Sequence, residues 1–163
     1  MNQAIAVLDR HVPYPSAGLP DPMFYFISRM TPLINVDLLI KDEGNRTLLA
    51  WRDDRFSGRG WHLPGGIIRF QERMETRLHK VIESEIGTTG VTFDPTPIAF
   101  NEIIIPGYRD RGHFISLLYR CYLHASFVPA NDGLLPTSPG FLRWYATCPE
   151  NLLGFHDIYR QFL

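Results

Sequence analysis

The chain has 163 residues, of which 45% are hydrophobic and 20% are charged, and its formal net charge is −1. This length and composition are typical of one globular domain with a sizeable core, and the near-neutral charge argues against a general nucleic-acid-binding surface. Two cysteines are too few for a disulfide framework, and no apolar run is long enough for a membrane span or a signal peptide, so a cytoplasmic protein without membrane contact is expected.

The N-terminal part of the chain is predicted to be an arm followed by a single domain. Residues 1–20 are weakly patterned, and their prolines favour extended backbone; this arm could cover a sheet edge, reach a partner subunit or be a loosely packed tail. The domain, residues 21–163, is expected to open with a short helix over 21–29, in which Asp21 caps the helix and Pro22 takes its first position. Two strands should follow, over 33–40 and 47–51, joined by a polar turn.

The segment from Trp61 to Gly87 carries the most informative pattern. A short apolar strand and a Pro-Gly-Gly turn lead into a helix over 74–86, whose apolar residues recur at helical spacing. Gly87 is placed to end this helix. At roughly 100° per residue, Glu85 falls about 20° from Met74, in the middle of the apolar stripe. A carboxylate directed into a core is costly unless it is paired or binds a metal ion, so Glu85 is the first functional candidate.

The C-terminal half is predicted to add four strands and a helix. The strands are expected over 91–93, 98–105, 113–125 and 141–146. A loop over 126–140 contains three prolines, and its length suggests function or mobility. Thr147 and Glu150 have the spacing of a capping box, which predicts that the last helix starts there.

The spacing around Glu85 resembles the Nudix box, G-x5-E-x7-R-E-U-x-E-E-x-G-U. Gly66, Glu72, Ile82, Glu85 and Gly87 match it, and Trp61-x-Leu63-Pro64-Gly65-Gly66 matches its usual lead-in. Four positions depart from the pattern: Lys80 stands in place of Arg, Val81 and Ser84 in place of Glu, and Thr88 in place of an apolar residue. The resemblance implies an α/β/α sandwich with a mixed central sheet.

The resemblance also implies a bound divalent ion, Mg²⁺ or alternatively Mn²⁺, held by oxygen ligands. Glu85 and a backbone carbonyl of Gly65 or Gly66 are the expected ligands, and Glu72 is a further candidate, although in the family it often braces the loop. Ser84 removes one carboxylate and with it one metal site. Lys80 is interpreted as a structural brace, weaker than Arg because it lacks the planar fork. The alternative for Glu85 is an ion pair with a buried arginine.

The flanking residues narrow the resemblance to GDP-mannose mannosyl hydrolases. The shared features are the run Met30–Asp37, the pair Trp51-Arg52 and the pair Arg143-Trp144. In those enzymes one Mg²⁺ is used, water attacks the sugar carbon and a nucleoside diphosphate leaves. The resemblance implies that Asp37 binds substrate and that Arg52 binds substrate and assists catalysis.

Two further arginines, Arg55 and Arg69, are candidates for binding phosphate, because guanidinium groups form paired hydrogen bonds with phosphate oxygens. The alternative for Arg52 and Arg55 is a solvated turn in which they pair with Asp53 and Asp54. The activity also has alternatives: an ordinary Nudix pyrophosphohydrolase, or a domain that binds nucleotides without catalysis.

The chain departs most from the mannosyl-hydrolase pattern at the position of the general base. The mannosyl hydrolases carry a Gln-His pair before the last strand, and by spacing Ser138-Pro139 occupies that position here. Proline cannot accept a proton, so another group must serve if the chain is an enzyme. The possible replacements are His113, His124 and Asp132, of which His113 is preferred because imidazole is the usual base near neutral pH. No role is assigned to the remaining histidines: His11, His62, His79 and His156.

A homodimer is expected, because residues 24–27 form a dense apolar patch outside the predicted sandwich and related proteins pair through similar regions. Sedimentation at micromolar concentration should give about twice the monomer mass of 18.8 kDa. A mass near that of the monomer would contradict the expectation.

Overall fold

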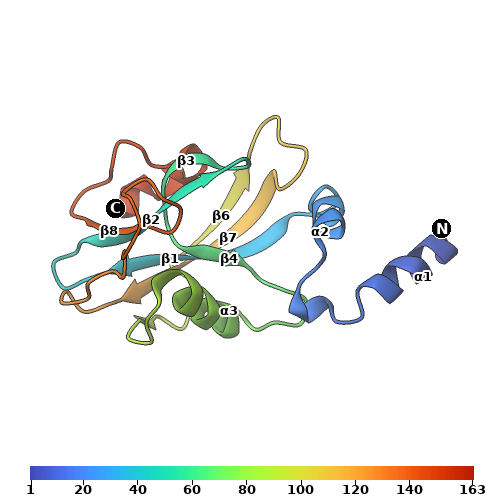
Figure 1. Cartoon of the computed structure of the whole chain (residues 1–163), viewed down its shortest axis with the longest axis horizontal. Helices are drawn as coiled ribbons and strands as arrows, with labels where there is room; N and C mark the ends of the chain where they lie inside the picture. Colours follow the sequence, from blue (N-terminus) through green and yellow to red (C-terminus); the bar gives the residue numbers. More distant parts are fainter.

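The strands form one mixed sheet of eight strands in the computed structural model, which describes residues 1–163 (Figure 1). Five strands follow the order β3-β2-β1-β7-β5, while β4 pairs with β1, β6 with β7 and β8 with β2. The pair β1–β7 is parallel and the others are antiparallel. The strands are β1 (Leu33–Lys41), β2 (Thr47–Asp54), β3 (Gly58–His62), β4 (Gly65–Ile67), β5 (Thr92–Phe93), β6 (Ala99–Ile104), β7 (His113–Tyr122) and β8 (Leu142–Tyr145).

Helix α3 packs on one face of the sheet and η3 on the other, which confirms the predicted sandwich of mixed α/β class; the chain has six helical segments. They are α1 (Asn2–His11), η1 (Pro15–Ala17), α2 (Asp21–Ser28), α3 (Met74–Val81), η2 (Ile82–Ile86) and η3 (Gly154–Phe162). Side chains alternate along β1: Val36, Leu38 and Ile40 pack with α3, whereas Leu39 packs on the opposite face with Tyr159 of η3. None of these helices is both long and apolar enough to cross a lipid bilayer.

The predicted helix over 74–86 is present, but its last five residues form a π-helical turn, η2. Gly87, in a left-handed conformation, donates its N–H to the carbonyl of Ile82, five residues earlier. This wider turn changes the direction of side chains relative to an α-helix. Glu85 therefore lies at the edge of the helix, with 28% of its side chain exposed, and not in the middle of the buried stripe as predicted.

The Pro-Gly-Gly segment continues as strand β4 rather than forming only a turn. Asp37 of β1 is paired with Gly65, and Val36 with Gly66. A Cβ atom on Gly65 would lie 2.3 Å from Asp37 Oδ1, and one on Gly66 would lie 2.8 Å from Val81 Cγ2. Both glycines are therefore required by close packing, the first against a carboxylate and the second against α3.

Three other expectations about local structure were wrong. Residues 2–11 of the arm form helix α1, which has no buried residue and extends away from the sheet (Figure 1). Asp21 is the first residue of α2 and makes no capping hydrogen bond. The last helix, η3, is a 3₁₀ helix that begins at Gly154, so Thr147 and Glu150 do not cap it.

The apolar patch at 24–27, which motivated the dimer, partly packs within the chain. The ring of Tyr25 lies 5.4 Å from that of Phe56, and the Arg111 guanidinium lies 5.8 Å from the ring of Phe24. Phe26 is the member of this patch that remains exposed. The dimer thus remains a prediction, with a smaller free surface than the sequence suggested.

Replacing Gly65 by Ala should destabilise the fold by about 1–3 kcal/mol, because the added methyl group overlaps the Asp37 carboxylate and the Val36 carbonyl. Gly154→Ala is the matched control, since no atom lies within 4 Å of a Cβ built there. Urea unfolding of both variants measures the difference. Equal stability of the two variants would contradict the packing argument.

Candidate active site

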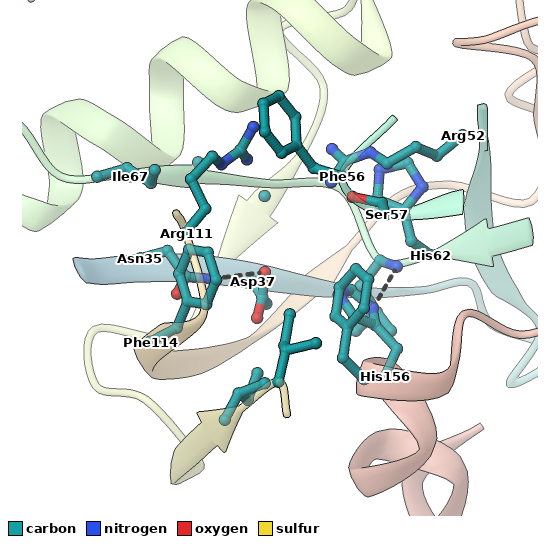
Figure 2. Close-up of a pocket in the computed structure, with 16 residues that line it drawn as sticks. Asn35, Asp37, Arg52, Phe56, Ser57, His62, Ile67, Arg111, Phe114 and His156 are labelled. Carbon is teal, nitrogen blue, oxygen red and sulfur yellow. Dashed lines mark hydrogen bonds between the residues drawn. The ribbon is translucent and has the colours of Figure 1, made fainter. Parts of the chain in front are cut away.

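A pocket of about 150 Å³ lies where the sheet divides. Strand β1 is in register with β2 at Lys41 but with β4 over residues 35–37, so β2 and β3 diverge from the first half of β1. Side chains from both halves of the divided sheet, from the β6–β7 turn and from η3 converge on the pocket (Figure 2). The lining includes Asn35, Asp37, Arg52, Phe56, Ser57, His62, Gly65, Gly66, Ile67, Arg111, Phe114, Phe155 and His156.

Asp37 is in the middle of this pocket and is almost completely buried, with 3% exposure. Its carboxylate accepts hydrogen bonds from Ser116 Oγ (2.5 Å), Tyr159 Oη (2.5 Å) and Asn35 Nδ2 (3.0 Å). Burial raises the pKa of Asp37, and these hydrogen bonds together with the charge of Arg52 only partly offset that effect. The expected buried aspartate therefore has its polar partners and lines the pocket, while its contact with substrate stays a prediction.

Glu85 lies beside the pocket, next to Gly65. Its pKa is raised to about 7, first by burial and also by the charge of Asp37, while Arg52 and the Gly65 backbone act in the opposite direction. Its Oε2 atom is 3.9 Å from His62 Nε2. Glu85 thus remains reachable from solvent without a hydrogen-bonded side-chain partner, as a metal ligand would require.

The backbone of Gly65 presents a second oxygen to the same region. Leu38 donates its N–H to Pro64 O and Ile68 donates to Ile34 O, each at 2.9 Å. Bonded pairs alternate in an antiparallel ladder, so Val36 and Gly66 also form a bonded pair, whereas Asp37 and Gly65 do not. The N–H and C=O of Gly65 consequently point away from β1, and the N–H stabilises the Glu85 carboxylate. Gly65, rather than Gly66, has a carbonyl free for a metal ion.

These donors fit a divalent ion that keeps several water ligands. No three His, Cys, Asp or Glu side chains are grouped closely enough to hold an ion by themselves. A carboxylate and a backbone carbonyl leave the remaining octahedral positions to water and substrate oxygens, which is the usual environment of Mg²⁺.

Two arginines reach the pocket. Arg52 lines it as predicted, and its closest carboxylate is Asp54, with a distance of 3.7 Å between Nε and Oδ2. Arg111 also lines it and has no carboxylate within ion-pair distance; its guanidinium lies between the rings of Phe24 and Phe56. Burial, and then the charge of Arg52, lower the pKa of Arg111. The sequence offered no reason to select Arg111 from its charged turn.

The other two predicted arginines lie outside the pocket. Arg55 stacks on Phe56, with its guanidinium 4.5 Å from the ring centroid. Arg69 donates a hydrogen bond to the carbonyl of Ala17 and so connects the arm to the loop before α3. Neither position supports the predicted contact with substrate.

The histidines differ most from the prediction. His113 does not line the pocket and instead lies at the start of β7, 3.2 Å from Glu102, and His124 pairs with Glu43 on the surface. Asp132, Ser138 and Pro139 do not line the pocket either. His62 and His156, which received no role, are the two pocket histidines (Figure 2).

Both pocket histidines are held neutral by their surroundings. Burial, followed by the charge of Arg52, places the pKa of His62 well below its usual value and lowers that of His156 to about 3. Both rings are positioned by residues distant in the sequence. Ala50 of β2 is in register with His62 of β3, and the N–H of Leu63 donates to His156 Nδ1. Neither contact is visible in a residue spacing.

Comparison with known proteins agrees with this architecture. The solved structure of a possible asymmetric diadenosine tetraphosphate hydrolase from Jonesia denitrificans matches 82% of this chain and 92% of its own, with a TM-score of 0.62 and 24% identity. The Nudix domain of Shewanella oneidensis NrtR, complexed with ADP-ribose, matches 90% of this chain and 92% of its own, with a TM-score of 0.55 and 15% identity. The chain has the Nudix fold.

The comparison of sequences gives a match over only part of the chain. The chain is 33% identical to the low-salt glycan biosynthesis protein Agl8 of Haloferax volcanii over 73 residues, which are 45% of this chain and 46% of that protein. The match thus spans less than half of the length of that relative. No family model matches the chain.

Within the Nudix box, Glu72 braces the loop before α3 and does not line the pocket. Its buried carboxylate lies 2.7 Å from Arg77 Nη2 and 2.9 Å from Lys80 Nζ, and it accepts the N–H of Arg69. Burial alone would raise the pKa of Glu72, but hydrogen bonds from Lys80, Arg69 and Arg77 outweigh it and lower the pKa to about 2. This geometry does not support Glu72 as a metal ligand, whereas Lys80 occupies the bracing position expected of it.

Replacing Glu72 by Gln should lower the free energy of unfolding by about 1–2 kcal/mol at pH 7, an estimate reduced for the solvent screening of the half-exposed Lys80. The pKa of Glu72 is lower in the folded chain than its ordinary value of 4.5, so its contribution is present above pH 4.5 and is lost as the pH falls toward 2. Urea unfolding at pH 7 and near pH 2.5 tests whether the free energies of unfolding of the two proteins converge at the lower pH.

The control is Glu75→Gln, because Glu75 lies three residues further on, is exposed in the first turn of α3 and forms no ion pair. We expect it to change stability by less than about 0.5 kcal/mol. A loss in Glu72→Gln that is equally large at both pH values would show that the ion pairs are not its cause.

Proposed function

We propose that this chain is a divalent-metal-dependent Nudix hydrolase that acts on a nucleoside diphosphate sugar. The observation that carries the proposal is the placement of two guanidinium groups, Arg52 and Arg111, around a pocket bordered by Glu85 and the free carbonyl of Gly65. Positive groups facing an oxygen-rich metal site suit a diphosphate, whose oxygens bind both.

Arg52 and Arg111 would bind and orient the diphosphate. Arg52 has a single long ion pair and Arg111 has none, so both have hydrogen-bond donors available for phosphate oxygens. The aromatic rings of Phe24 and Phe56 fix the Arg111 guanidinium without neutralising it. A divalent ion held by Glu85 and Gly65 would add charge neutralisation on the leaving diphosphate.

The interior of the pocket suits a sugar. Its volume of about 150 Å³ is below the usual range of about 300–1,000 Å³ for a complete ligand site, so it would take one group of a larger molecule. Asn35 and Asp37 supply polar contacts, and Phe114 and Phe155 supply apolar walls. The similarity to a protein of glycan biosynthesis supports a nucleotide sugar, and GDP-mannose is the first candidate because of the flanking resemblance.

The bond that breaks is proposed to be the bond between the sugar carbon and the diphosphate. With Val81 and Ser84 in place of two carboxylates, and with Glu72 engaged by Arg77 and Lys80, Glu85 is the box carboxylate left to hold a metal ion. One metal site beside two arginines would stabilise a departing nucleoside diphosphate, whereas attack at phosphorus usually draws on more carboxylates.

A second candidate is a domain that binds a nucleotide derivative without hydrolysing it. The observation in its favour is that His113, His124 and Asp132 all lie outside the pocket, so none of the expected bases faces it. The Nudix domain of NrtR, with ADP-ribose bound, has the same fold. Calorimetry with a nucleotide sugar separates the candidates, since tight binding without turnover favours the binding domain and rapid product release excludes it.

Purified protein should hydrolyse at least one member of a nucleotide-sugar panel in the presence of Mg²⁺ or Mn²⁺. Glu85→Gln should lower kcat by at least about 100-fold, because it removes the carboxylate that binds the ion. Glu83→Gln is the matched control, since Glu83 is exposed on the same turn and should leave the rate unchanged. Unchanged activity in Glu85→Gln would count strongly against the proposal.

Hydrolysis in ¹⁸O-labelled water identifies the bond. Label in the free sugar, released with an unlabelled nucleoside diphosphate, is the result expected for attack at carbon. Label in a phosphate group, with a nucleoside monophosphate and a sugar phosphate as products, would instead establish an ordinary Nudix pyrophosphohydrolase.

A further inference from the structure

His62 has a buried nitrogen without a partner. Its side chain is 5% exposed, and Nε2 makes no hydrogen bond. The other ring nitrogen, Nδ1, is 2.8 Å from the carbonyl oxygen of Ala50. A carbonyl oxygen can only accept, so Nδ1 carries the proton and Nε2 of the neutral ring has a free lone pair. Leaving such an acceptor unsatisfied in the interior costs about 1–3 kcal/mol, which points to a missing partner.

His156 does not share this property. Its Nδ1 accepts the N–H of Leu63 at 3.2 Å, so in the neutral ring Nε2 carries the hydrogen and has no lone pair to offer. Of the two pocket histidines, only His62 can therefore bind a cation without a change of tautomer.

The partner that fits the His62 nitrogen is the ion already assigned to Glu85. The two atoms, His62 Nε2 and Glu85 Oε2, are 3.9 Å apart, which is too long for a hydrogen bond. Two ligand atoms that each lie about 2.1 Å from one ion are separated by about 3.0 Å at neighbouring positions and about 4.2 Å at opposite positions. The observed separation lies within this range. The bond from Nδ1 to a backbone carbonyl is also the usual support of a metal-binding histidine.

We propose that His62 Nε2 is a ligand of the divalent ion at this site, together with Glu85 and the Gly65 carbonyl. The proposal rests on the metal site of the proposed function and adds a nitrogen donor to it. Mg²⁺ prefers oxygen ligands, whereas imidazole nitrogen favours transition-series ions. The site should therefore select Mn²⁺, Co²⁺ or Zn²⁺ over Mg²⁺.

The direct test is pulsed electron paramagnetic resonance of Mn²⁺ bound to the full chain. Protein made with ordinary histidine should show modulation from a coordinated ¹⁴N nucleus, and protein made with ¹⁵N-labelled histidine should show that of ¹⁵N instead. This measurement needs no substitution, so it stands even if changes at His62 impair folding. Bound Mn²⁺ without a histidine nitrogen signal would overturn the proposal.

Calorimetry with MnCl₂ and MgCl₂ assigns the nitrogen to His62. His62→Gln should weaken Mn²⁺ binding by about 10-fold or more and Mg²⁺ binding by less than about 3-fold. His79→Gln is the control, because His79 is exposed on α3 and packs on Phe93 outside the pocket. Equal weakening for both ions, or no weakening, would overturn the role of His62.

The outcomes separate the two proposals. A histidine-coordinated Mn²⁺ in a protein that hydrolyses no nucleotide sugar would retain the ligand assignment and reject the proposed function. Glu85-dependent hydrolysis by a protein whose bound Mn²⁺ shows no histidine nitrogen signal would retain the proposed function and reject the ligand assignment. Absence of any Mn²⁺ or Mg²⁺ binding would reject both.

Discussion

The buried carboxylate of Asp37 is the constraint on which the site depends. It joins four elements: β1 carries it, Ser116 of β7 and Tyr159 of η3 donate to it, and Gly65 of β4 packs against it. An uncompensated carboxylate in this position would be costly, so the position of Asp37 depends on contacts from all of these elements. The same assembly brings the Gly65 carbonyl to the edge of the pocket.

The division of the sheet explains why the pocket draws on so many segments. Because β4 takes the place of β2 beside the first half of β1, the polar side chains of Arg52 and His62 are separated from Asp37 by open space rather than by a packed strand. Tyr159 packs with Leu39 on the face of β1 that carries Asp37 and donates a hydrogen bond to the Asp37 carboxylate. A regular sheet of the same strands would bury these groups against one another and leave no site.

Much of the fold could be predicted because its elements follow local periodicity. The strands over 33–41 and 113–122 are rich in apolar strand-forming residues, and the helix from Met74 has a repeating buried face. Asp37, Arg52 and Glu85 could be selected because a charge among apolar residues, or a motif position, is visible in the sequence. Arg111 and His62 could not, since their importance comes from aromatic rings and from a carbonyl far away in sequence. Glu72 was ambiguous for the same reason, because the side chains around it decide between bracing and metal binding.

The π-helical turn at Ile82–Ile86 makes the site sensitive to the number of residues as well as to their identity. Its hydrogen bond from Gly87 to Ile82 spans one residue more than an α-helical bond, so the segment holds one residue that regular helical bonding would not need. A shortening by one residue could keep the helix and its apolar contacts intact while turning Glu85 away from Gly65. The direction of the Glu85 carboxylate therefore depends on the number of residues in this segment, which a comparison of residue types alone does not show.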